Sequence, residues 1–155
     1  KVSDEMFQKE WYPNCVYGQL CLYEKNYEKA ITFFKKAIGV AQSNLEPLRM
    51  LGFAYGKNNQ PEQAKEILVQ LTEMKASRYV APFHFATVYF GLGDLDNAFK
   101  EMYKSYEEHD FHMRWMWKEI TFRDAQVQND PRYRDLLTKM KLGHLPPRTR
   151  MPLKE

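Results

Sequence analysis

Small and hydrophobic residues recur along the chain with a period of 34 positions. Ala30, Ala64 and Ala98 are each separated by this interval, and the same shift relates Gly18 to Gly52. The segments "YGQLCLYEKNYEKAITFF", "LGFAYGKNNQPEQAKEIL" and "FATVYFGLGDLDNAFKEM" are therefore three copies of one pattern. A period of this length is typical of stacked supersecondary units that share one continuous core.

Each copy is predicted to form two helices joined by a turn. A glycine inside a helix costs about 1 kcal/mol, so a small residue kept in register indicates close approach of a neighbouring helix. Left-handed backbone near the turns would be tolerated by Asn26, Asn59 and Gly93. The first turn of each opening helix contains Pro13, Pro47 or Pro82, and Pro61 starts a second helix, where a missing N–H is harmless. The pattern predicts an all-α, right-handed superhelix with repeats at residues 11–44, 45–78 and 79–112.

The segment "DFHMRWMWKEIT" begins where a fourth repeat would start, but the repeat pattern ends there. Arrays need an atypical terminal unit, so residues 113–142 are predicted to cap a domain of residues 1–142. Met113, Trp117 and Ile120 would face the last repeat, and Trp115 is the residue that could face the groove instead. In "DPRYRDLLTKM", Asp130 and Pro131 are predicted to begin a closing helix. Residues 143–155 form a basic, proline-rich tail, expected to pack on its own domain or on a neighbouring copy.

The small-x2-aromatic and Ala-x3-large spacings resemble the tetratricopeptide repeat, over residues 11–108. The third copy, with "RYV", "YFGLGD", "YEE" and the later "DPRY", is similar to the C-terminal tetratricopeptide region of bacterial multidomain signalling and transcription-regulator proteins. That resemblance implies attachment to a DNA-binding, kinase or cyclase domain, and a start at Lys1 instead of Met is consistent with a fragment. The chain departs from that group at "EITFRDAQV", where a second Asp-Pro is usual.

Stacked helix pairs present a concave surface lined by the first helix of each pair. In each first helix, the residue after the repeated small residue is expected to point toward this concave surface. So are the residues three or four positions before and after it. Aromatic and polar side chains mix there, as in a peptide-binding groove, and the alternative is that the chain's own termini fill part of it. The candidate partner-binding residues are Tyr12, Cys15, Gln19, Tyr23, Arg49, Phe53, Lys57, Phe83, His84, Thr87 and Phe90.

One known mode of peptide binding is disfavoured by the residues in this groove. Tetratricopeptide co-chaperones hold acidic C-terminal peptides with Lys and Asn side chains from the same helices. The matching places in this chain are occupied by Cys15, Gln19, Met50, Val80 and His84.

Composition narrows the class of protein. The 155 residues suit one domain, and a net charge of +3 is too small to indicate nucleic-acid binding. No apolar run reaches the roughly 18 residues of a membrane span. Cys15 and Cys21 would lie about 240° apart on a helix, which disfavours a disulfide, and two free thiols fit a reducing, cytoplasmic compartment.

The sequence contains only weak candidates for a metal site or a phosphate-binding loop. His109 and His112 could share a helix face, but no further ligands complete a metal site. "GFAYGK" has one residue too few between its glycines for a phosphate loop, and Asn58 follows where Ser or Thr should bind magnesium. The sequence predicts a non-catalytic module without cofactors that binds a peptide or partner domain in the concave groove and contacts neither nucleic acid nor membrane. The alternative is a regulatory or oligomerisation segment of a larger bacterial signalling protein, and a homo-oligomer stays open.

Overall fold

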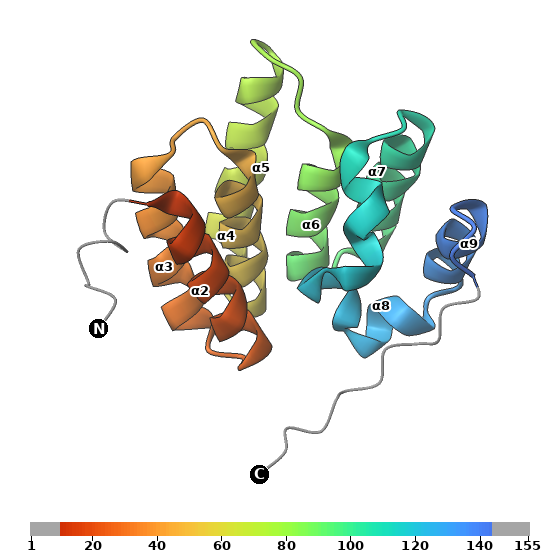
Figure 1. Cartoon of the computed structure of the whole chain (residues 1–155), viewed down its shortest axis with the longest axis horizontal. Helices are drawn as coiled ribbons and strands as arrows, with labels where there is room; N and C mark the ends of the chain where they lie inside the picture. The colour runs from red at the N-terminus through yellow and green to blue at the C-terminus, as the bar shows by residue number, and fades with distance from the viewer. Residues whose placement is uncertain (1–9, 144–155) are drawn as a thin grey trace.

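Three consecutive pairs of helices form the body of the molecule (Figure 1). The computed structural model describes residues 10–143, and no β-strand occurs within that range. The prediction of an all-α helical-repeat superhelix is confirmed. The pairs are α2 (Trp11–Tyr23) with α3 (Tyr27–Val40), α4 (Leu45–Lys57) with α5 (Pro61–Lys75), and α6 (Pro82–Leu92) with α7 (Leu95–Glu107).

The turn inside each pair places one residue in the left-handed region. Asn59 (φ 57°) and Gly93 (φ 75°) do so as predicted. In the first pair the residue is Lys25 (φ 59°) and not Asn26. Asn26 instead caps α3, since its side-chain oxygen accepts a hydrogen bond from the backbone N–H of Lys29 at 3.2 Å.

The prolines lie where a helix does not need their N–H. Pro61 and Pro82 are the first residues of α5 and α6, and Pro13 and Pro47 lie in the first turns of α2 and α4. The predicted placement in the opening turns is confirmed.

Small residues mark the closest helix contacts. A Cβ added to Gly18 would lie 2.5 Å from the ring of Phe34, and one added to Gly56 would lie 2.5 Å from the carbonyl oxygen of Gly91. The repeat alanines Ala30, Ala64 and Ala98 are fully buried. The period of small residues therefore records contacts between helices.

Beyond α7 the chain leaves the repeat pattern. Two 3₁₀ segments, η1 (Phe111–Lys118) and η2 (Ile120–Arg123), precede the short helices α8 (Ala125–Asn129) and α9 (Pro131–Lys139). The predicted helical face of Met113, Trp117 and Ile120 is wrong, because a 3₁₀ helix aligns every third residue and buries Met113 with Met116. The side chain of Trp117 and the tail from residue 144 onward lie outside the described residues.

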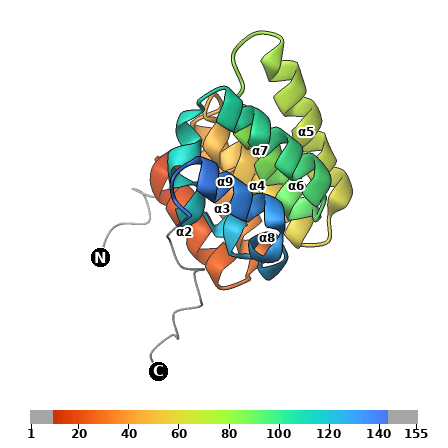
Figure 2. The same ribbon diagram turned by 90° about the vertical axis from the view of Figure 1, so that its right-hand side faces the viewer.

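Helix α9 covers the last repeat, as Figure 2 shows. Its N-cap Asp130 accepts a hydrogen bond from the backbone N–H of Arg132 at 2.9 Å, and Pro131 opens the helix, as predicted. The hydroxyl of Tyr103 on α7 donates to Asp135 at 2.7 Å, and the guanidinium of Arg132 lies 4.7 Å from the ring centre of Phe99. Helix α9 therefore packs against α7, while residues 110–124 take a different path. The capping role expected for residues 113–142 stays a prediction.

Candidate interaction groove on the concave side

Helix α4 carries a line of cationic and aromatic side chains on the face that the sequence predicted to be concave. Arg49, Phe53 and Lys57 follow one another at intervals of four residues and so share a face. At 1.5 Å rise per residue, the ends of this line are about 12 Å apart. The ammonium of Lys57 lies 5.7 Å from the ring centre of Phe53.

Helix α6 forms the adjoining wall. Arg49 lies 5.2 Å from the ring centre of Phe83, and its Nη1 donates to the hydroxyl of Thr87 at 3.3 Å. The Thr87 hydroxyl in turn donates to the carbonyl oxygen of Phe83 at 3.0 Å. The floor between α4 and α6 thus combines aromatic rings with one fixed guanidinium.

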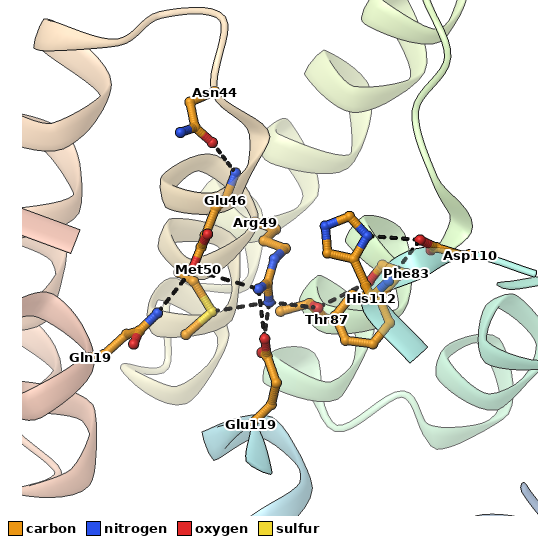
Figure 3. A network of polar contacts seen from close by, with 10 residues as sticks. All are labelled: Gln19, Asn44, Glu46, Arg49, Met50, Phe83, Thr87, Asp110, His112 and Glu119. Carbon is orange, nitrogen blue, oxygen red and sulfur yellow. Dashed lines mark hydrogen bonds and ion pairs between the residues drawn. The ribbon is translucent and has the colours of Figure 1, made fainter. Parts of the chain in front are cut away.

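Residues 110–124, here called the groove segment, occupy this floor (Figure 3). Arg49 donates to both carboxylate oxygens of Glu119, Nη1 to Oε2 at 2.9 Å and Nη2 to Oε1 at 2.8 Å. At the far end of α4, Lys57 donates to Asp124 at 2.6 Å. The two cations of α4 therefore bind the two carboxylates that flank η2.

An aromatic side chain fills the space between these ion pairs. The ring of Phe122 makes an edge contact with Phe90, at 5.1 Å between ring centres, and lies 6.2 Å from Phe83. On its other side it stacks with Tyr133 of α9 at 5.8 Å. Phe122 is 2% exposed, so the groove segment contributes to the core as well as to the ion pairs.

The ion pairs shift the pKa values of Arg49 and Asp124. Burial alone would lower the pKa of Arg49, but attraction and hydrogen bonding to Glu119 outweigh it and raise that pKa. Burial likewise opposes ionisation of Asp124, while the hydrogen bond from Lys57 lowers its pKa. Arg49 and Asp124 are therefore both charged at neutral pH.

The start of the groove segment is tethered to α7. Asp110 accepts hydrogen bonds from the hydroxyl of Ser105 at 2.5 Å and from the backbone N–H of His112 at 3.0 Å, and its Oδ1 lies 2.8 Å from Nδ1 of that imidazole. Burial opposes ionisation, but these bonds lower the pKa of Asp110 to about 2. The His112 ring stacks on Phe83 at 5.3 Å and meets the edge of His84 at 4.7 Å.

The two histidines considered for a metal site do not share a helix. His109 follows the end of α7 with a left-handed backbone (φ 54°) and is exposed, whereas His112 belongs to η1. No group of three metal-ligating side chains occurs in residues 10–143. In the same residues, no helix is long and apolar enough to cross a bilayer.

The candidate residues of α2 differ in exposure. Cys15 is buried, and burial followed by repulsion from Glu46 raises its thiol pKa to about 12. Gln19 donates to Glu46 at 3.2 Å. Tyr23 lies 4.6 Å beneath the guanidinium of Arg123 and remains exposed, as does Tyr12, at 64%.

Comparison with known families bears on this architecture. The model of a family described as tetratricopeptide repeat matches residues 22–84, from the end of α2 to the start of α6. The match supports a tetratricopeptide repeat family. No curated protein and no solved structure matches the chain.

The groove predicted between α4 and α6 holds a segment of the chain itself in this structure. Glu119 binds Arg49, His112 packs on Phe83 and His84, and Phe122 packs on Phe83 and Phe90. A partner therefore has no access to these four groove residues in this conformation. The alternative drawn from the sequence named the chain's own termini, which lie outside the described residues. Within the described residues it is an internal segment that makes these contacts. Seven of the eleven candidates are buried: Cys15, Arg49, Phe53, Phe83, His84, Thr87 and Phe90.

Partner binding by the candidate residues stays a prediction. Tyr12 and Tyr23 are exposed, while Gln19 and Lys57 are partly exposed at the edge of the closed groove. Glu119, Phe122 and Asp124 were not among the predicted site residues, although all three lie in "EITFRDAQV", the stretch where the sequence departs from the pattern that it resembles. That departure was the available signal.

Proposed function

We propose that this chain is a non-catalytic protein-interaction module that binds its partner on the concave side of its helical repeats. Tetratricopeptide repeats generally mediate protein–protein interaction, and their concave surfaces are extended binding sites. The observation that carries the proposal is the two-point grip of Arg49 on Glu119. A surface that holds one segment from outside the repeats by carboxylate and aromatic contacts has the chemistry to hold another.

The cluster closest in composition to a catalytic triad supports the same conclusion. In such a triad the serine hydroxyl meets the imidazole, which acts as its base. Here the hydroxyl of Ser105 donates to Asp110, and His112 meets the same carboxylate through Nδ1. Ser105 is also fully buried. The cluster therefore tethers the chain after α7 and does not form an activated nucleophile.

The exposed edge of the concave side offers a direct test. A photoreactive phenylalanine analogue at Tyr12 or Tyr23 should cross-link the same protein in cells, because both side chains are exposed on α2. The matched control places the analogue at Val69 on α5, which is 57% exposed on the second helix of its pair. Equal adducts at all three positions, or none at Tyr12 and Tyr23, would refute the proposal.

The same experiment addresses the alternative, a regulatory or oligomerisation segment of a larger bacterial signalling protein. Adducts at Tyr12 and Tyr23 with a second copy of this chain would favour that function. Adducts with an unrelated protein would favour the partner-binding module.

A further inference from the structure

Among the described residues, some buried polar atoms near the contact between the groove segment and the helices have no hydrogen-bond partner. Arg49 Nε, His84 Nδ1 and Thr121 Oγ1 are buried without a hydrogen-bond partner in the described part of the chain. All three belong to the floor of the groove or to the segment that covers it. A buried polar group without a partner costs about 1–3 kcal/mol, so this fit is incomplete although the two ion pairs are well formed.

The groove segment has the form of a short peptide ligand. Its backbone is extended at Glu119 (ψ 144°) and Asp124 (ψ 131°), and only the four residues of η2 lie between them. Each extended residue supplies a carboxylate to α4, and Phe122 supplies the intervening ring. The contacts thus follow a simple pattern, a carboxylate, an aromatic residue three positions later, and a second carboxylate two positions after that.

We propose that the groove segment is an intramolecular ligand, and that the partner of the groove is a peptide with the same carboxylate–aromatic–carboxylate pattern that binds by displacing it. This inference rests on the proposed function and adds the chemistry of the partner. The segment occupies the site until the partner arrives, so the module is self-inhibited.

Each element of the pattern has a recognition group in the groove. The planar guanidinium of Arg49 makes two parallel hydrogen bonds with a carboxylate, which lysine cannot do. Phe83 and Phe90 provide the ring contacts for an aromatic side chain. Lys57 then binds a second carboxylate about 12 Å along α4 from Arg49. A peptide that matches one carboxylate but not the spacing would leave a cation unpaired.

Displacement follows from linkage between the two ligands. A tethered segment competes at an effective concentration on the order of millimolar. The apparent affinity for an added peptide is its intrinsic affinity multiplied by the fraction of molecules whose groove is open. Substitutions in the groove segment that weaken its contacts with α4 should therefore strengthen binding of the peptide. Substitutions of the groove residues on α4 should abolish binding of the peptide.

The test uses the full chain and a fluorescein-labelled peptide with the sequence of Lys118–Gln126, followed by fluorescence anisotropy. The double variant Glu119→Gln/Asp124→Asn should bind the peptide at least about tenfold more tightly than the wild type. Adding Lys57→Met should reverse the gain, and a peptide with Ala in place of Phe122 should bind at least about tenfold more weakly. The matched control is Glu62→Gln, which removes an exposed ion pair with Lys65 on α5 and should leave peptide affinity unchanged.

A double variant that keeps its helical circular dichroism but binds no more tightly than the wild type overturns the proposal. So does the absence of binding to either protein at about 1 mM peptide, the scale of the tether's effective concentration. If the double variant does not fold, amide hydrogen exchange of the wild-type chain at that peptide concentration tests displacement instead. Residues 110–124 should lose protection while α3 keeps it, and unchanged protection of both overturns displacement.

The result of the peptide-binding test can be distinguished from the result of the cross-linking test of the proposed function. Cross-links at Tyr12 and Tyr23 without peptide displacement would leave the interaction module standing and remove the intramolecular ligand. Peptide displacement without those cross-links would retain the groove chemistry and refute the partner contact at the edge formed by α2.

Discussion

Arg49 on α4 and Glu119, 70 residues later, are joined by two parallel hydrogen bonds of 2.9 and 2.8 Å. The side chain of Arg49 is only 2% exposed and that of Glu119 is 18% exposed. The pair therefore connects the middle repeat to a segment that lies outside the repeat pattern. Because its charges are largely removed from water, each depends on the other for compensation.

Phe122 should contribute far more to stability than Trp115, although both are aromatic and seven residues apart in the chain. Phe122→Ala should cost about 3–5 kcal/mol, because it empties a buried site between Phe90 and Tyr133. Trp115→Ala should cost under about 1 kcal/mol, because its side chain is 46% exposed. Urea unfolding measures both, and equal losses would show that the groove segment is not packed as described.

Glycine substitutions test the close approach of neighbouring repeats. Gly56→Ala should destabilise the fold by more than about 2 kcal/mol, because the new Cβ would overlap the backbone of Gly91. Gly39→Ala, also in a helix, should stabilise by up to about 1 kcal/mol, since nothing lies within 4 Å of its new Cβ. Thermal unfolding of the two variants should move in opposite directions. A loss of stability in both, or in neither, would contradict the packing between α4 and α6.

His84 should make stability depend on pH below neutrality. Burial, then repulsion from Arg49 and His112, lowers its pKa from 6.5 to about 3, against a smaller opposing effect of Asp110. The unfolded chain therefore binds a proton near pH 6.5 that the folded chain does not. This contribution is complete above pH 6.5 and is lost as pH falls toward 3. The loss should reach a few kcal/mol.

The matched variant is His84→Met, which fills a similar volume without a titratable group. Unfolding free energies should fall between pH 7 and pH 4 for the wild type and much less for the variant. The effect of Asp110 can be separated from that of His84 by its pH range. Because the pKa of Asp110 is lowered in the folded chain, its contribution to stability is lost only below about pH 3.8. Parallel pH curves for the two proteins would contradict the burial of a neutral His84.

The repeat body could be predicted because its determinants are local and recur. Small residues, prolines and turn residues act within one helix pair, and the period of 34 residues shows them three times. The one error in the turns, Asn26 for Lys25, arose because asparagine favours both a left-handed turn and an N-cap. The structure uses Asn26 for the second of these.

The groove segment could not be predicted in the same way. Its conformation depends on contacts with residues far away in the chain, such as those of Glu119 with Arg49 and Asp124 with Lys57. The helical spacing of Met113 and Ile120 favoured a regular helix, but the tether at Asp110 and the extended backbone at Glu119 divide the segment into 3₁₀ turns. The sequence placed Arg49 and Lys57 among the candidate groove residues, but it did not indicate the ion pairs that they form with Glu119 and Asp124.

The most direct measurement of the central claim is a double-mutant cycle between Arg49 and Glu119. Arg49→Met and Glu119→Gln preserve most of the side-chain volume, and urea unfolding gives the free energies of the single and double variants. We predict that Glu119→Gln alone costs about 3 kcal/mol, because it leaves Arg49 buried with only Glu46 at 4.0 Å. The coupling energy should be at least about 1.5 kcal/mol. A coupling energy near zero would show that Glu119 does not occupy the groove.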